Sequence, residues 1–175
     1  MCQTNLRHPV EGVMSSDAFA AGLKALSAMP GRLEAAAESV PAKLWTTPDE
    51  NGGFSFVEHA CHLRDIDAEG FLVRIGRMLS ETKPALPDID GARLAAERDY
   101  LAQDFQTAVR EFARARADLV RRLEALTPAE HLRIGVLEGV GEISIDALVA
   151  KILEHDDEHR RDFEALRSQL SDRGL

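Results

Sequence analysis

The fold is decided by the stretch Lys151-Ile-Leu-Glu-His-Asp-Asp-Glu-His-Arg-Arg-Asp-Phe163. Its apolar residues recur at the three-to-four-residue spacing of a helix. The same apolar stripe continues on both sides of the stretch, through Ile145, Leu148, Ile152, Leu166 and Leu170. His155 and His159 fall on this stripe, one helical turn apart, where leucine would be expected. Because a buried polar group without a partner costs roughly 1–3 kcal/mol, both imidazoles need something to bind.

Two interpretations of this pair stay open. Each imidazole could be satisfied separately by a carboxylate or a carbonyl, or both could hold one metal ion. A third ligand from another helix would favour the metal, and the segment 55–80 supplies two candidates, His59 and His62. Three neutral imidazoles with open positions form a catalytic or substrate-binding site rather than a closed structural one, and they suit zinc, nickel or iron.

Acidic residues near these histidines could orient the rings by accepting the second ring proton. The candidates are Asp65, Glu154, Asp156, Asp157 and Glu158. The competing interpretation of each is a solvated helix face. His8 and His131, in the tail and in a loop, are taken as incidental.

Three further segments have helical spacing, so that the chain is predicted to be an all-α four-helix bundle. Residues 16–40 are interrupted by Pro30-Gly31, where we expect a kink or two shorter helices. Residues 55–80 open with a capping box, Ser55 to Glu58, and are apolar on two sides. Residues 91–126 form the third helix, whose arginines and acids are most simply a solvated surface. The only strand that we expect is a short one within 132–137, and Ser144 caps the last helix.

These elements predict a single domain over residues 16–172, preceded by a loose lead-in at 1–15. A length of 175 residues suits one domain with a sizeable core. The net charge of −9 argues against nucleic acid or an anionic membrane as a partner. No stretch approaches the roughly 18 apolar residues of a membrane span, and no secretory signal is visible. Two cysteines, Cys2 and Cys61, do not suggest a disulfide, so we expect a cytoplasmic protein.

Several catalytic patterns are absent from the sequence. There is no Glu-x-x-His on the histidine helices for a diiron site, no His-Glu-x-x-His zinc-protease helix, no glycine-rich phosphate loop and no Gly-x-Ser-x-Gly elbow. Cys61 adjoins His62, but neighbours on a helix point about 100 degrees apart, which is poor geometry for a dyad. We therefore place Cys61 in the core.

Two motifs resemble those of the DinB-like (DinB/YfiT) superfamily of metal-binding four-helix bundles. They are Phe54-Ser-Phe-Val-Glu-His-Ala-Cys-His-Leu-Arg-Asp65 and Leu153-Glu-His-Asp-Asp-Glu-His159, the latter followed by Phe163-Glu-Ala-Leu-Arg167. In that family a histidine directly before a leucine in the second helix joins a His-x3-His pair in the last. The resemblance, which covers residues 16–170, therefore implies the metal ligands His62, His155 and His159. His59 falls one turn before the family's ligand position.

The resemblance also implies an up-down-down-up bundle, often dimeric, with the metal near one end. Its members with known chemistry include thiol S-transferases that use low-molecular-weight thiols, a thiol-dependent isomerase and metal-dependent hydrolases. We therefore expect a metal-dependent thiol S-transferase acting on a small molecule, with a hydrolase as the alternative. The rival is a non-catalytic interaction module. Glu69 is expected on the His62 face, near the pocket, and no other residue is assigned a catalytic role.

Overall fold

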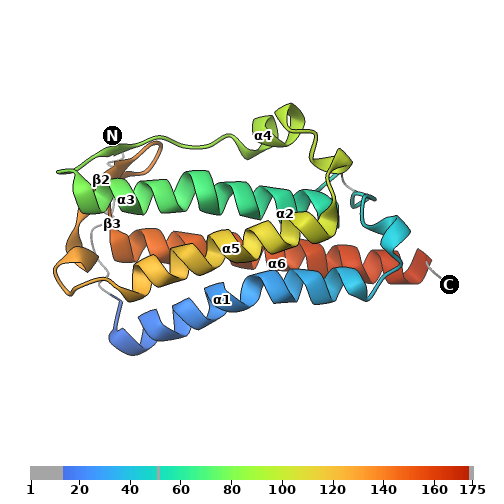
Figure 1. The fold of residues 1–175 in the computed structure, drawn as a ribbon, viewed down its shortest axis with the longest axis horizontal. Coiled ribbons are helices and arrows are strands. Elements are labelled where there is room, and N and C mark those ends of the chain that lie inside the picture. Colours follow the sequence, from blue (N-terminus) through green and yellow to red (C-terminus); the bar gives the residue numbers. More distant parts are fainter. Residues whose placement is uncertain (1–13, 51, 174–175) are drawn as a thin grey trace, which may run out of the picture.

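The computed structural model describes residues 14–50 and 52–173, so most of the predicted lead-in lies outside the described residues. Four long helical segments pack side by side (Figure 1). They are α1 (Ser16–Glu38), a segment made of α2 (Phe56–Asp65), the π-helix η2 (Ile66–Phe71) and α3 (Leu72–Ser80), then α5 (Phe105–Glu124) and α6 (Ile145–Arg173). α1 and α6 run in one direction and the other two run against them (Figure 1), which is the predicted up-down-down-up order.

The first helix is not divided at Pro30. Ser15 caps it, because its side chain accepts a hydrogen bond from the Ala18 amide at 3.2 Å. The helix then continues through Pro30 to Glu38. A proline inside a helix removes one backbone hydrogen bond. Burial of its neighbours Met29 and Leu33, 2% and 0% exposed, offsets that loss.

The second helical segment reaches Ser80 as predicted, but one turn of it is the π-helix η2. The predicted capping box is present, with Glu58 N–H donating to Ser55 Oγ and Ser55 N–H donating to Glu58. A π turn contains an extra residue, which rotates every later side chain around the axis. Ala68 is therefore exposed, whereas Phe71 enters the core. Of the apolar positions predicted after this turn, Ile75 is fully buried and Leu72 and Leu79 pack against the core, whereas Val73 is 50% exposed.

The predicted helix over 91–126 was also wrong, because the chain forms two helices there. α4 (Gly91–Glu97) ends before a short 3-10 turn, η3 (Tyr100–Ala102), and α5 begins at Phe105. Asp99 has a left-handed backbone with φ 47°, and Asp104 caps α5 by accepting from Thr107 N–H at 2.8 Å. Leu101, which the periodicity placed in the apolar row, is 46% exposed.

A small three-stranded sheet closes the end of the bundle where α6 begins. Its strands are β1 (Ala85–Leu86), β2 (Ile134–Leu137) and β3 (Gly141–Ser144). β2 pairs with β1 in parallel and with β3 in antiparallel register. The strand expected within 132–137 is present as β2, and Ser144 caps α6 as predicted, with Ala147 N–H donating to its hydroxyl. Two further 3-10 turns are η1 (Ala42–Leu44) and η4 (Glu130–Leu132).

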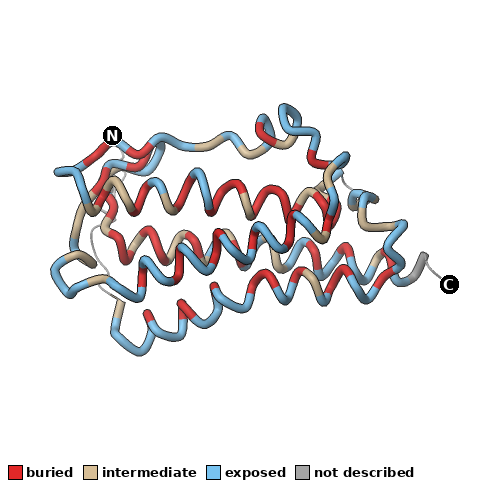
Figure 2. Tube along the Cα trace, viewed as in Figure 1, coloured by how far each residue is buried: buried red, intermediate tan, exposed pale blue. Residues whose placement is uncertain are grey.

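The core lies between the four helical segments, where their buried stripes face one another (Figure 2). Cys61 is fully buried in it, as predicted. Across the described part of the chain, the helices are too short or too polar to cross a membrane.

Candidate metal centre

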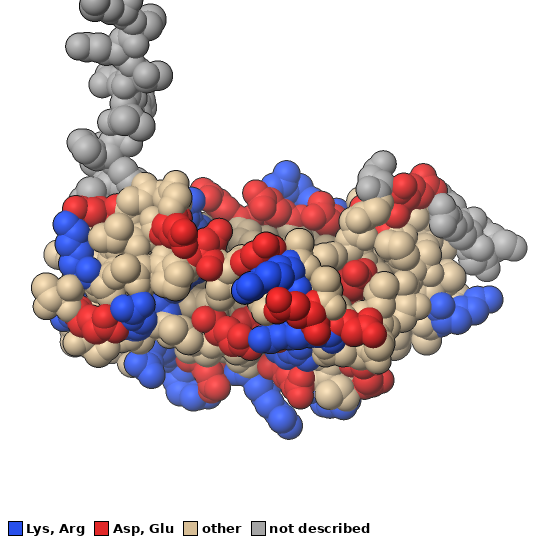
Figure 3. Space-filling model, turned by 90° about the horizontal axis from the view of Figure 1, so that it is seen from above, with Lys and Arg blue, Asp and Glu red and all other residues tan. Residues whose placement is uncertain are grey.

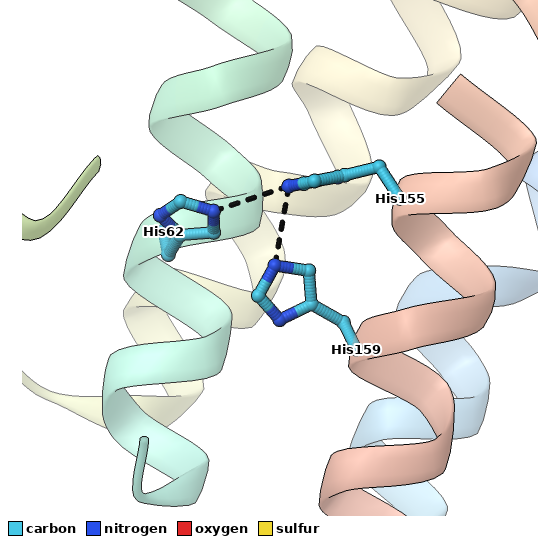
Figure 4. A group of neighbouring side chains, drawn as sticks. All are labelled: His62, His155 and His159. Atoms are coloured by element: carbon cyan, nitrogen blue, oxygen red, sulfur yellow. Dashed lines mark hydrogen bonds between the residues drawn. The ribbon is translucent and has the colours of Figure 1, made fainter. Parts of the chain in front are cut away.

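Helices α2 and α6 bring the three predicted ligands together (Figure 4). His62 comes from α2, and His155 and His159 lie one turn apart on α6. Nε2 of His155 is 3.2 Å from Nε2 of His62 and 3.2 Å from Nε2 of His159. Nitrogens about 2.0–2.1 Å from one tetrahedral ion are about 3.3–3.4 Å apart. The spacing of these atoms, all within 4.8 Å of one another, therefore fits a single ion.

Hydrogen bonds between the rings cannot account for this arrangement. A ring nitrogen of a neutral imidazole carries either one proton or one lone pair. Nε2 of His155 can therefore form one well-directed N–H···N bond, although two nitrogens approach it equally closely. An ion that takes the lone pairs of all three Nε2 atoms removes this conflict, so the donor set fits a bound divalent metal.

The cluster is also held in the neutral, metal-binding protonation state. Burial lowers the pKa of His62 to about 4 and that of His155 to about 3. The pKa of His159 is lowered too, by burial and then by the neighbouring imidazoles. Since protonation and metal binding compete for the same lone pair, these lowered pKa values favour an ion at neutral pH.

A fourth histidine lies directly behind the cluster. His59, 2% exposed, places its Nδ1 3.0 Å from Nδ1 of His159. Burial lowers the pKa of His59 to about 3. A neutral His59 can accept the Nδ1 proton of His159 and so hold that ring with Nε2 turned toward the other two ligands. The sequence left the role of His59 open, and the structure places it against a candidate ligand.

The acids proposed to orient the rings do not do so. Asp65 accepts from Arg64, Arg98 and Tyr100, and Asp157 accepts from Arg160. Nδ1 of His62 and Nδ1 of His155 are buried without a hydrogen-bond partner among residues 14–50 and 52–173. Glu69 does not face the cluster either, because it is exposed and pairs with Arg98.

A buried ion cluster instead supports the ligand-bearing turn of α6. Arg116, 1% exposed, donates to Asp67 at 2.6 Å and to Asp156 at 2.9 Å. Asp156 follows His155 directly, and Asp67 lies in the π-helix η2. Arg116 was predicted to belong to a solvated surface, and that prediction was wrong. Its guanidinium ties three helices together beside the candidate metal centre.

Aromatic rings and the crossover segment (residues 81–104, between α3 and α5) cover the cluster. Phe54 lies 5.3 Å from His62 and 6.3 Å from His159 between ring centroids. Gly91, at the start of α4, packs so closely on His62 that an added Cβ would lie 2.4 Å from Cε1 of that ring. This close approach requires glycine.

A cavity of about 290 Å³ adjoins the cluster at His155. Charged residues of both signs line it, including Arg74, Lys151, Glu154 and Glu158. The face of the molecule that carries the crossover likewise mixes acidic and basic side chains (Figure 3). The cavity volume suits a small-molecule substrate rather than a polymer.

An up-down-down-up bundle with three converging imidazoles is the arrangement of a class of metal-binding helical proteins. The sequence profile of the DinB superfamily matches residues 25–163, so the chain belongs to this superfamily. Among solved structures it is similar to YfiT from Bacillus subtilis, described as "a probable metal-dependent hydrolase with an unusual four-helix bundle topology". The two chains are 18% identical, the match covers 96% of this chain and 99% of YfiT, and the TM-score is 0.84. At this identity the likeness shows a shared fold. No curated protein matches the chain.

Proposed function

We propose that the protein is a metal-dependent enzyme that holds one divalent ion through His62, His155 and His159. The observation that carries the proposal is the convergence of three imidazoles, in which Nε2 of His62 and Nε2 of His159 each lie 3.2 Å from Nε2 of His155. A divalent ion on three imidazoles keeps open positions and lowers the pKa of water or a thiol bound there, which supplies a nucleophile near neutral pH.

Hydrolysis of a small molecule is the first candidate reaction. The description of YfiT supports it, since that protein has the same fold over nearly the whole chain. The surroundings of the cluster also suit it. Phe54 and Phe71 place apolar rings against the histidines and limit the access of bulk water, while the cavity beside His155 leaves one side open to a substrate.

Transfer of a low-molecular-weight thiol, the reaction predicted from the sequence, is the second candidate. Its support is the three-imidazole cluster, whose open metal positions could take a thiolate. The charge of the cavity does not decide between the two reactions, because two basic residues stand against Asp88, Glu138, Glu154 and Glu158. Lys151 and Arg74 both line the cavity. The guanidinium of Arg74 donates to the Pro87 carbonyl at 2.7 Å and to Asp88 at 3.2 Å. Both cations lie on the side of the cluster where His155 is accessible.

Elemental analysis of the purified protein tests the metal site. We expect about one equivalent of metal in the wild type and none in the His155→Ala variant. Asp162→Ala is the matched control, because Asp162 is an exposed residue of the same helix, and it should keep its metal. A wild-type protein without stoichiometric metal would contradict the proposal.

Cobalt substitution and then turnover separate the two reactions. If the protein transfers thiols, a low-molecular-weight thiol should change the visible spectrum of the cobalt form by adding a sulfur ligand. A spectrum that no thiol changes would contradict thiol transfer, whereas a change is decided by turnover, since the open positions of a hydrolase metal also accept thiols. A hydrolase should cleave esters or amides, lose that activity on chelation and recover it with added metal.

A further inference from the structure

A second cavity lies far from the histidine cluster, at the end of the bundle where α1 and α6 begin and α5 ends (Figure 1). Its volume is about 840 Å³, and much of its wall is apolar, formed by Met14, Phe19, Leu23, Leu123, Leu126 and Pro128. Asp146 in this wall precedes His155 by nine residues, which is about 13 Å along the axis of α6. The cavity is therefore distinct from the proposed metal site, and its volume is large enough for a small organic molecule.

A hydrogen bond between the buried Asp146 and the partly exposed His131 stands in this largely apolar wall. Asp146 is 1% exposed, and its Oδ1 lies 2.6 Å from Nδ1 of His131. Its Oδ2 accepts from the backbone N–H of Met14 at 2.8 Å. Because a carboxylate can only accept, Nδ1 of the neutral imidazole carries the ring proton and Nε2 holds a lone pair. Phe19 packs edge-on against the same ring, with centroids 4.6 Å apart, and limits its rotation.

The second nitrogen of this ring, Nε2, takes no part in the bond to Asp146. Within residues 14–50 and 52–173, no group is hydrogen-bonded to Nε2 of His131. If the pair served only to tie the 3-10 turn η4 to α6, the bond at Nδ1 would be sufficient. It would not explain why the oriented ring stands in the wall of a large cavity with its lone pair free. The ring therefore has the geometry of an anchor for a hydrogen-bond donor.

The charges around the cavity indicate what kind of molecule it would take. Lys24 and Glu124, both in the lining, have opposite signs, and Asp146 is already paired. We propose that this cavity is a second binding site, for an uncharged amphipathic molecule whose hydroxyl or N–H group donates to Nε2 of His131. Its apolar body lies against Phe19, Leu23 and Leu126.

Two small aromatic probes of similar size test this proposal by calorimetric or NMR titration. 4-Propylphenol can donate a hydrogen bond, whereas propiophenone can only accept one. We expect the wild type to bind 4-propylphenol about tenfold more tightly, as one hydrogen bond permits. In Asp146→Asn the amide oxygen can keep the Met14 bond while the NH2 group donates to Nδ1. Nε2 then carries the proton, and the preference should reverse toward propiophenone.

Two further variants show where the probes bind. Ala20 is an exposed residue of the wall, so Ala20→Trp should fill the cavity without disturbing the core and weaken both probes at least tenfold. His155→Ala should leave both affinities unchanged, because it alters only the proposed metal site.

Three results would overturn the proposal. One is the absence of saturable binding of either probe to the wild type. Another is the same probe preference in the wild type and in Asp146→Asn, since the imidazole would then not be the anchor. The third is conversion of a dimer to a monomer by Ala20→Trp, because this face would then be an interface between copies of the chain.

Discussion

Nδ1 of His59 lies 3.0 Å from Nδ1 of His159, on the opposite side of that ring from the nitrogen that faces the other candidate ligands. This contact joins a residue outside the metal-ligand pattern to one inside it. It holds the His159 ring in place and fixes which of its nitrogens keeps the lone pair.

We therefore expect His59→Leu to weaken metal binding about 10- to 100-fold while leaving the stoichiometry at one ion, since outer contacts of ligating histidines have effects of this size. Competition with a chromophoric zinc chelator measures the affinity. His59→Gln keeps an acceptor for the His159 proton and should recover part of the loss. Unchanged affinity in the leucine variant would show that the contact is incidental.

A separate prediction concerns Gly91, which packs against His62 on the other side of the cluster. An added Cβ would lie 2.4 Å from Cε1 of His62, so Gly91→Ala must displace either that ring or the start of α4. We expect at least a tenfold weaker metal affinity with little change in unfolding free energy.

Gly76→Ala is the matched control, because nothing lies within 4 Å of the position where its Cβ would be. Gly76 is inside α3, where alanine is the better helix former by about 1 kcal/mol, so this variant should be slightly more stable and bind metal normally. Equal metal affinity in the two variants would mean that metal binding by His62 does not depend on its close contact with Gly91.

The four-helix fold and the pair His155 and His159 followed from helical spacing, whereas His62 was preferred to His59 because the resemblance to the DinB-like superfamily implied it. His155 and His159 share a face in any regular helix, and His62 precedes the π turn that would have rotated it away. Ala68 within that turn and Val73 after it were placed on apolar faces but are exposed, because apolar periodicity assumes 3.6 residues per turn throughout. The break in the helix at Asp99 was missed because apolar residues on both sides of it, such as Leu94 and Phe105, fit one continuous helical pattern.

Partners distant in the sequence could not be predicted at all. Arg116 pairs with Asp67 and Asp156, which are 49 and 40 residues away, so that its position on the apolar stripe, four residues from Phe112 and from Val120, does not reveal its partners. For the same reason the role of His59 was left open and His131 was taken as incidental. Their significance depends on which residues the bundle places against them.

Replacement of Arg116 should be strongly destabilising. Arg116→Met leaves two buried carboxylates without their cation, and breaking such a cluster costs about 3–5 kcal/mol. Arg121→Met is the control: Arg121 is 71% exposed and pairs with Asp118, so its loss should cost less than about 1 kcal/mol. Urea unfolding of both variants at pH 7 measures the difference, and equal losses would contradict the role assigned to Arg116.

The loss of stability in Arg116→Met should also depend on pH, and the sign of that dependence follows from the pKa values of the two carboxyl groups. Burial already raises the pKa of Asp67 to about 6 and raises that of Asp156. A carboxyl whose pKa is higher in the folded state stabilises the fold when protonated, and it loses that contribution as pH rises through the folded-state pKa. The deficit of Arg116→Met relative to wild type should therefore shrink from pH 7 to pH 5. A deficit that grows on acidification would exclude buried carboxylates as its cause.

The metal-free histidine cluster should make the fold sensitive to acid. Burial lowers the folded-state pKa of His59 and His155 to about 3 and that of His62 to about 4, against 6.5 for an unperturbed histidine. The unfolded chain therefore takes up protons below pH 6.5 that the folded chain does not, and stability falls as pH drops from about 6.5 toward these lower values. At pH 5 the effect is about 2 kcal/mol for one such imidazole.

Urea unfolding of the chelator-treated protein at pH 7 and pH 5 measures this loss of stability. The loss should be smaller in His59→Leu, because that variant lacks one of the buried histidines. Bound metal should protect the fold over the same range, since the ion occupies lone pairs that protons would otherwise take. We expect the metal to be retained at pH 5 and released only nearer pH 4. Release of the metal at pH 6 to 6.5 would show that the histidines titrate as exposed groups and that the cluster is not closed to water.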